Sequence, residues 1–346
     1  MLVDFRPQNG PKNRQAPTLV AHWTYEHVPN WFFQADQSQH TLASMSTTLK
    51  GSLLAAGALA LVGSLVAAAD LVEGYPLAAG QTLRYAAAGL VLLAVARGRL
   101  PRLDRREALA MVALAATGLV LFNLFVIEGV RETDPATIGV IVGCVPVVLA
   151  FAGPLLERRP LSGRVIVAAV VVAAGAAGVQ WAGGGITEKG LLLALGALGC
   201  EAAFSLLAVP HLRRLGPLAV STYACLLATP MLAAWSLLAE GPTLPVPNAE
   251  QGAALAYMAL GVTVFGFLAW YSAVNLLGVE RAGLFSGVLP VSALAFSAVL
   301  GVAEITPERL AAVAVVAIGV TLGVRGAESP LRETSTSRLR AFASGG

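Results

Sequence analysis

Long apolar stretches recur along most of this chain, separated by short polar segments. Each stretch holds about 20 mostly apolar residues, the length at which an α-helix crosses the hydrocarbon core of a bilayer. The stretches cover roughly residues 52–72, 76–96, 107–129, 134–156, 162–182, 190–210, 217–239, 252–277, 282–303 and 308–325. The pattern therefore predicts an all-α integral membrane protein with ten transmembrane helices.

The composition agrees with a chain embedded in lipid. Hydrophobic residues make up 56% of the 346 positions and charged residues 12%, whereas about a quarter of a soluble domain is charged. The net charge of +3 is modest and gives no support for nucleic acid binding. Cys144, Cys200 and Cys225 fall inside predicted spans, where they act as small apolar residues and not as a disulfide framework.

Both ends of the chain are polar and fall outside the predicted spans. Residues 1–47 show no periodicity and lack the apolar core of a signal peptide. We expect a disordered leader there, or a mis-assigned start ahead of Met45, and a binding role for its aromatic residues is the alternative. Residues 327–346 are expected to form a disordered cytoplasmic tail.

The basic residues predict the orientation, because Lys and Arg concentrate in short cytoplasmic loops. With the N-terminus inside, only Arg131, Lys189 and Arg309 lie outside, and Arg84 lies within a span. The inner set is Arg6, Lys12, Arg14, Lys50, Arg97, Arg99, Arg102, Arg105, Arg106, Arg158, Arg159, Arg164, Arg213, Arg214, Arg281, Arg325, Arg332, Arg338 and Arg340. We therefore expect a multi-pass protein of the cell membrane with both termini cytoplasmic.

The two halves of the chain resemble each other. The segment that begins Lys50-Gly51 matches the one that begins Lys189-Gly190, and Pro76-Leu77-Ala78 matches Pro217-Leu218-Ala219. Glu157-x-x-Pro160 likewise matches Glu304-x-x-Pro307. A repeat of five spans must enter the membrane in the opposite sense, and such inverted repeats build transporters with a site near the midplane. We expect repeats at 48–185 and 186–326 around a central cavity.

These features resemble the drug/metabolite transporter superfamily, in its ten-helix EamA-type members. The resemblance rests on Gln81 to Ala88 in the second span and on Asp134 to Pro160, with its internal Pro146, in the fourth. It continues with Ala269-Trp270 in the eighth span and Arg281 to Val291 in the ninth. It implies a secondary carrier whose two bundles rock around a cavity, usually an exporter of small metabolites or drugs.

Two positions depart from the pattern of that family. Its first helix usually carries Trp-Gly with a lysine about two turns later, where this chain has Val62-Gly63 and Asp70. The matching position of the sixth helix, again usually Trp, is Glu201. Substrates of better-known members therefore do not transfer to this chain.

Arg84 and Glu201 are the main candidates for substrate binding or coupling, because a charge near the bilayer centre costs at least about 2.5 kcal/mol. Arg84 could pair with Glu201 across a cavity, or form a structural clamp with Asp70 or Glu128. Desolvation disfavours the charged form of a mid-membrane carboxylate. Glu201 is accordingly a candidate proton carrier, the alternative being a neutral side chain bonded to a carbonyl.

Other polar or aromatic side chains within the spans are expected to line the cavity in part. Gln81, Arg84 and Tyr85 share one helix face by their spacing. Further candidates are Asn123, Ser205, Tyr223, Trp270, Tyr271 and Asn275. Pro146 and Pro290 are candidate kinks at a gate, or tolerated kinks without a function.

These observations favour a secondary active transporter that exports a small organic solute (a metabolite, an amino acid or a drug), with proton coupling as a further expectation. The alternatives are a passive channel and a non-transporting scaffold, and small-residue faces could support a homodimer. An enzyme is disfavoured because the chain has no HExxH, GxSxG or Walker motif. No metal-spaced cluster indicates a metal, and no motif indicates a cofactor.

Overall fold

The computed structural model describes residues 30–65, 70–72, 74–133, 135–180, 187–241, 245–299, 301 and 305–325. Contacts divide the chain into two compact units, Met1–Ser44 and Met45–Gly346. The expected leader, residues 1–47, lies outside the described residues up to residue 29, and its last part belongs to the helix α1 (Asn30–Gly63). The expected tail at 327–346 lies wholly outside the described residues.

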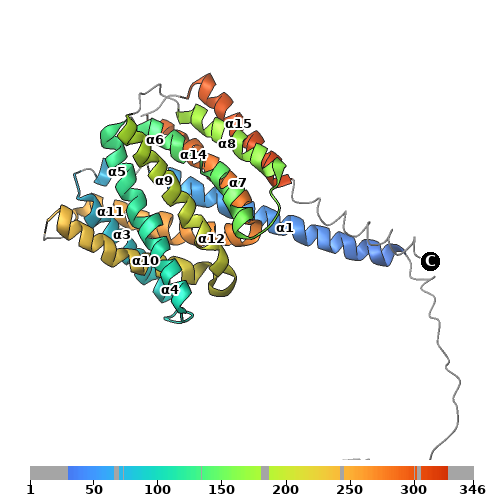
Figure 1. The fold of residues 1–346 in the computed structure, drawn as a ribbon, viewed down its shortest axis with the longest axis horizontal. Helices are drawn as coiled ribbons and strands as arrows, with labels where there is room; N and C mark the ends of the chain where they lie inside the picture. Colours follow the sequence, from blue (N-terminus) through green and yellow to red (C-terminus); the bar gives the residue numbers. More distant parts are fainter. Residues whose placement is uncertain are drawn as a thin grey trace, which may run out of the picture. The chain divides into compact units, whose positions relative to one another are not determined.

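The described part of the chain is helical (Figure 1). After α1, the first repeat contains η1 (Asp70–Val72), α3 (Leu77–Val95), α4 (Arg105–Leu114), the π-helix η2 (Ala115–Leu121), α5 (Phe122–Glu132), α6 (Pro135–Val142), α7 (Val145–Leu156) and α8 (Gly163–Gln180). The second contains α9 (Glu188–Leu206), α10 (Val209–Ala239), α11 (Ala249–Tyr257), the π-helix η3 (Met258–Phe265), α12 (Gly266–Leu277), α13 (Val279–Leu284), η4 (Phe285–Gly287), α14 (Val288–Val299) and α15 (Pro307–Arg325).

Ten apolar helical segments are present among the described residues, as the sequence predicts. Eight are long enough to cross a bilayer, and the shorter helices Thr47–Gly63 and Gly163–Val179 complete the set. The first predicted span was placed too far along the chain, because α1 ends at Gly63 and not near residue 72. Gly216, with φ at 75°, separates a short helix from the seventh span, which starts at Pro217 as predicted.

Four of the spans are interrupted, whereas the sequence predicted kinks only in the fourth and ninth, at Pro146 and Pro290. The third and eighth spans each contain a π-helix, η2 and η3, in which a widened turn inserts an extra residue. The fourth span breaks between α6 and α7, and the ninth passes through the 3₁₀ turn η4. The irregular turns thus occur at matching places in the two repeats.

The repeat is more regular than the sequence matches indicated. In the fourth and ninth spans, Gly139, Gly143 and Pro146 correspond to Gly283, Gly287 and Pro290 with one constant separation of 144 residues. Both spans therefore read Gly-x-x-x-Gly-x-x-Pro. Pro146 and Pro290 hold equivalent positions, each in the first turn of the helix that follows the break, where a missing N–H costs no hydrogen bond.

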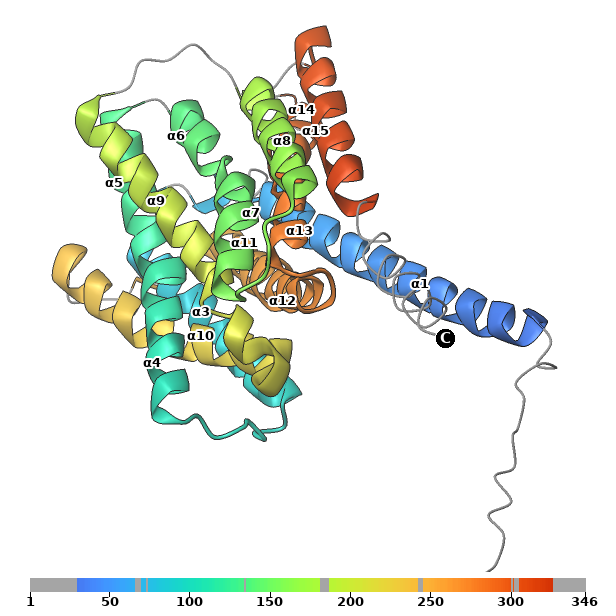
Figure 2. The same cartoon turned by 45° about the vertical axis from the view of Figure 1, so that its right-hand side comes forward.

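Helices α8 and α15 pack side by side in both views (Figure 1, Figure 2). A Cβ placed on Gly175 would lie 2.8 Å from the backbone nitrogen of Val316, and one on Gly319 would lie 2.9 Å from that of Val172. Gly175 corresponds to Gly319, and Val172 to Val316, by the same separation of 144 residues, so each contact is the counterpart of the other. The crossing is therefore a pseudo-two-fold contact between the repeats, made by glycines that let the backbones touch.

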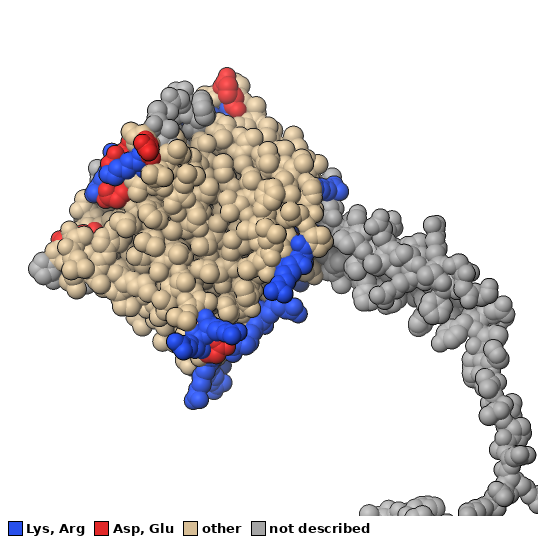
Figure 3. Space-filling view, in the orientation of Figure 1, with Lys and Arg blue, Asp and Glu red and all other residues tan. Residues whose placement is uncertain are grey.

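Charged residues gather at the two ends of the helical bundle (Figure 3). The arginine-rich end carries Arg99, Arg102, Arg105, Arg106, Arg158, Arg159, Arg164, Arg213 and Arg214. Here Arg214 pairs with Glu107, joining α10 to α4. At the opposite end Lys189 pairs with Glu132 at 2.6 Å, and Glu240 accepts hydrogen bonds from the first free N–H groups of α3, at Ala78 and Ala79.

Candidate functional site

A small cavity lies inside the bundle, between residues of both repeats. Its volume is about 60 Å³. It is lined by Ala58, Leu59, Val62, Val145, Leu149, Glu201, Phe204, Ser205, Val262, Gly266, Phe267, Trp270 and Ser286. Val145 is the first residue of α7, directly after the break in the fourth span, and Ser286 belongs to η4 in the ninth, so the cavity lies at the level where both helices are interrupted.

Glu201 brings the only charge among the described residues that line this cavity. It lies on α9, 13 residues after the helix begins at Glu188, roughly 20 Å along the axis at 1.5 Å per residue. Within the described residues its carboxylate has no hydrogen bond and no ion pair.

Aromatic side chains surround the Glu201 side of the cavity. The rings of Phe204 and Phe267 lie 5.0 Å apart, and those of Phe204 and Tyr271 lie 5.2 Å apart. Trp270 donates its Nε1–H to Ser205 at 3.2 Å, and Tyr271 donates to the Phe204 carbonyl at 3.1 Å. These bonds satisfy the polar atoms of both side chains and fix the planes of their rings.

The cavity brings together the two positions at which the sequence departs from the family pattern. Val62 on α1 and Glu201 on α9 correspond in the two repeats, and both line the cavity. Two inverted repeats place equivalent side chains around the pseudo-two-fold axis. Only the position in the second repeat, Glu201, carries a charge, so the two halves of the cavity differ in their chemistry.

Arg84 lies elsewhere, and the expected pairing with Glu201 is not present. Arg84 is buried on α3, with 7% of its surface exposed, and does not line the cavity. Its Nε–H donates to the Thr263 hydroxyl at 2.8 Å, and its Nη1–H donates to Gln81 at 3.4 Å. The alternative clamp with Glu128 is also absent, because Glu128 pairs with Arg131 at 2.6 Å. The side chain of Asp70 lies outside the described residues.

The Arg84 contact supports the π-helix η3. Thr263 donates its own hydroxyl proton to the carbonyl of Met258, five residues earlier, at 3.0 Å. The same oxygen accepts from Arg84, so a single hydroxyl joins the guanidinium of α3 to the widened turn of η3. Through these bonds Arg84 connects α3 to η3 in this arrangement. Sequence reasoning missed Thr263 because a threonine in an apolar span carries no separate signal.

The other candidates divide between the surroundings of the cavity and distant positions. Trp270 lines the cavity, as Ser205 does. Tyr85 is buried, and its ring lies 6.4 Å from that of Phe267, which lines the cavity. Asn123 donates its side-chain N–H to the Leu119 carbonyl at 2.7 Å. Gln81 accepts a hydrogen bond from Arg84 and, like it, does not line the cavity. Tyr223 is remote, since it donates to the Pro101 carbonyl at 2.8 Å and anchors the loop before α4.

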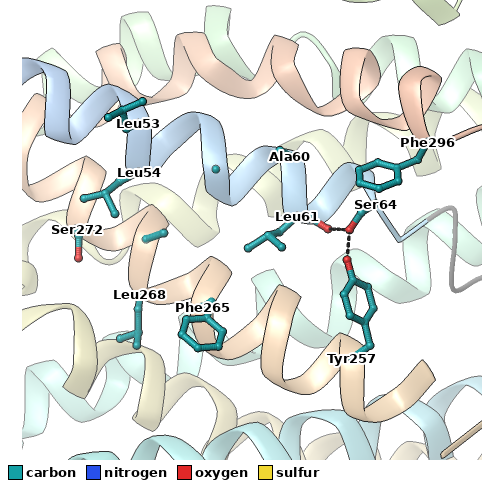
Figure 4. A pocket seen from close by; sticks show the side chains of 12 residues that line it. Leu53, Leu54, Ala60, Leu61, Ser64, Tyr257, Phe265, Leu268, Ser272 and Phe296 are labelled. Carbon is teal, nitrogen blue, oxygen red and sulfur yellow. Dashed lines mark hydrogen bonds between the residues drawn. The ribbon is translucent and has the colours of Figure 1, made fainter. Parts of the chain in front are cut away.

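A larger groove lies between α1 and α12, next to the cavity but on the other face of both helices (Figure 4). Its volume is about 560 Å³. Leu53 and Phe265 on its walls are 64% and 65% exposed, and the hydroxyls of Ser64 and Tyr257 bond to each other at one end. Exposed apolar walls are typical of a surface that faces lipid, so size alone does not identify the solute site.

Comparison with known proteins shows the family. The profile of the EamA-like transporter family matches residues 49–181 and 188–325, one match for each repeat. The chain belongs to the EamA-like transporter family. It is a multi-pass membrane protein with the two-repeat architecture that the sequence predicts, and it is a transporter of the drug/metabolite superfamily.

Relatives of this EamA-like transporter agree with that assignment. It is 27% identical over 241 residues to the "Uncharacterized transporter YetK" of Bacillus subtilis (strain 168), covering 66% of this chain and 73% of YetK. It is 25% identical to the "Uncharacterized transporter YyaM" of the same organism, covering 71% of this chain and 82% of YyaM. A solved crystal structure shares the fold with a TM-score of 0.70, at 21% identity, covering 82% of this chain and 99% of that one.

The contact between Arg84 and Thr263 gives a stability prediction for this EamA-like transporter. Thr263→Val keeps the volume but leaves the buried Arg84 Nε–H without its acceptor, which costs about 1–3 kcal/mol. We expect a lower thermal unfolding midpoint in detergent. The control is Thr222→Val, because Thr222 is equally buried and bonds only within its own helix, to Leu218. Equal midpoints for the two variants would contradict the structural role of Arg84.

Proposed function

We propose that the chain is a secondary active transporter that exports a small organic solute across the cell membrane. The cavity at Glu201 would be exposed to each side in turn, and a proton would move in exchange through Glu201. The proposal is supported by the family, by the cavity between two inverted repeats, and by the different packing of equivalent positions at the two ends of the bundle.

That difference in packing is the observation that carries the proposal. At the arginine-rich side of the breaks, a Cβ on Gly283 would lie 3.3 Å from the Cβ of Leu149, and one on Gly153 would lie 2.6 Å from Val279. All four residues are buried. The equivalent positions on the other side are Gly139, Ala293 and Ser297, together with Pro135. Of these, Gly139, Ala293 and Ser297 are only half-buried. This asymmetry supports a state that is closed at the arginine-rich end.

An ion pair strengthens the closed end. Arg159, just after α7, contacts Glu280 of α13 at 2.9 Å. Burial alone would lower the pKa of Arg159, but its hydrogen bonds to Glu280 and Glu157 outweigh that effect and raise the pKa. Opening this end would separate the Arg159–Glu280 pair and the glycine contacts together. The closure is therefore a discrete contact that a carrier could break and remake.

Cross-linking the closed end tests the carrier against a channel or scaffold. The substituted side chains of Leu149→Cys and Gly283→Cys fall within disulfide reach. We expect oxidation of the double variant, with the native cysteines replaced by alanine, to abolish counterflow exchange in proteoliposomes, and reduction to restore it. The labelled solute would be the one that differs most between cells lacking and overproducing the protein.

Each single cysteine variant serves as the control, and its exchange should be the same after oxidation as after reduction. Exchange that continues after complete cross-linking would contradict alternating access. Solute flux without counterflow, whether or not the cross-link forms, would indicate a channel.

Proton coupling through Glu201 gives a second prediction. Glu201→Gln removes the titratable proton, so solute movement should lose its dependence on an imposed pH gradient. Glu201→Asp keeps a carboxyl group and should keep that dependence. Glu188→Gln, at the exposed start of the same helix, is the control. The proton role would be overturned if solute transport by Glu201→Gln still depended on the pH gradient, or if transport by Glu201→Asp no longer depended on it.

The orientation is a further part of the proposal, supported by the arginine-rich end. We place that end and both termini in the cytoplasm, because positive residues stay on the cytoplasmic side. In intact cells, a membrane-impermeant maleimide should label Lys189→Cys but not Lys50→Cys, and lysis should expose the latter. Labelling of both positions from outside would refute the inverted repeat, and the reverse pattern would invert the orientation.

A further inference from the structure

We propose that the solute is an organic cation with an aromatic or apolar body, bound with its charge at Glu201 and its body against the surrounding rings. This inference rests on the proposed transport function and names the class of solute for the same site. It follows from three properties of the cavity: its single charge, the exclusion of Arg84, and the position of the aromatic side chains.

The charge of the cavity selects a cation. Glu201 is the only ionisable residue among its described lining residues, and no hydrogen bond or ion pair within the described part of the chain neutralises it. An isolated carboxylate in a low-dielectric interior is costly unless it is protonated or paired. A cationic ligand supplies the missing partner, whereas an anionic ligand would place two like charges together.

The position of Arg84 argues against a zwitterion. An amino acid would need a positive group for its carboxylate beside the carboxylate that holds its amine. Arg84 is the only basic residue that the sequence places deep within a span, and its guanidinium is bonded to Thr263 and Gln81. Because Arg84 does not line the cavity, the lining offers an anionic group no countercharge.

The aromatic residues provide the second half of the recognition. Phe204, Phe267 and Trp270 line the same cavity as Glu201. A cation over the face of such a ring gains about 0.5–2 kcal/mol, most when both groups are desolvated. The Trp270 N–H is occupied by Ser205, so the indole offers the ligand its ring and no hydrogen-bond donor. This combination suits a quaternary or tertiary ammonium better than a heavily hydrated ion.

The size of the cavity shows that binding requires movement. A volume of about 60 Å³ corresponds to roughly two water molecules, whereas organic ligands occupy pockets of about 300–1,000 Å³. Leu149 and Val145 form part of the wall and belong to α7, the helix that closes the arginine-rich end. Displacement of α7 would widen the cavity, so cation binding and opening use the same helix.

Binding of a permanent cation to the purified full-length chain in nanodiscs tests this inference. The probe is benzyltrimethylammonium, which has one ring and a charge that does not titrate. We expect saturable binding, weakened at least about tenfold in Glu201→Gln, as loss of a charged partner predicts. Glu188→Gln should bind like the wild type, and Glu201→Asp should retain most of the affinity. Thermal unfolding of each variant confirms folding.

Three competitors define the class. None of the three should displace the probe. They are neopentylbenzene (which is the uncharged isostere of the probe), anionic phenylacetate and zwitterionic phenylalanine. The cation site would be overturned if phenylalanine or phenylacetate displaced the probe at the probe's own concentration. It would also be overturned by the absence of saturable binding to the wild type, or by unchanged binding to Glu201→Gln.

The two proposals fail separately. Glu201-dependent binding of benzyltrimethylammonium without counterflow of any solute would leave the cation site and remove the carrier. The opposite result is counterflow of a neutral or anionic solute that the Leu149→Cys and Gly283→Cys cross-link blocks but Glu201→Gln does not change. This result would support the carrier function and overturn the proposal that the solute is a cation.

Discussion

Close backbone contact at glycines is the interaction on which this architecture depends. In lipid, the hydrophobic effect does not drive helices together, so they associate where small residues allow tight packing. Gly175 and Gly319 form one such crossing between α8 and α15, in which each glycine faces the backbone of the other helix. Because the contact is reciprocal, it fixes the two repeats about a common axis, and the positions of the cavity residues follow from that axis.

The same packing rule makes the two ends of the bundle interchangeable in principle. Gly139 and Gly283 are equivalent, and so are Leu149 and Ala293, yet only the pair Leu149 and Gly283 is fully buried. Symmetry of sequence combined with asymmetry of packing is what two alternative states of one structure require. The breaks before Pro146 and Pro290 divide the fourth and ninth spans into separate helical segments. The π-helices occupy matching places in the third and eighth spans, and η3 is stabilised by Arg84 through Thr263.

Much of this fold could be predicted from the sequence, because hydropathy records which segments lie in lipid. The ten segments, the inverted repeat and the mid-span position of Glu201 all follow from it. The partner of Arg84 could not be predicted, since any of three carboxylates was compatible with the spacing, and the actual acceptor is a hydroxyl in η3. The π-helices leave no periodic signal, because they shift the phase of an already apolar segment. The Gly-x-x-x-Gly-x-x-Pro motif of the fourth and ninth spans was available in the sequence but becomes evident only once both breaks are aligned.

Arg84 and Glu201 show why a buried charge does not by itself reveal function. Both carry a formal charge inside spans, and the cost of desolvation applies to both. The guanidinium of Arg84 donates to the neutral groups of Thr263 and Gln81 and lies 5.2 Å from the centre of the Tyr85 ring, and the Thr263 bond joins α3 to η3. Glu201 borders a cavity, and within the described residues its carboxylate has no hydrogen bond and no ion pair. A buried carboxylate without protein partners is a place where a proton or a cationic ligand can bind and leave. We therefore place the proposed solute site at Glu201 and not at the more conspicuous arginine.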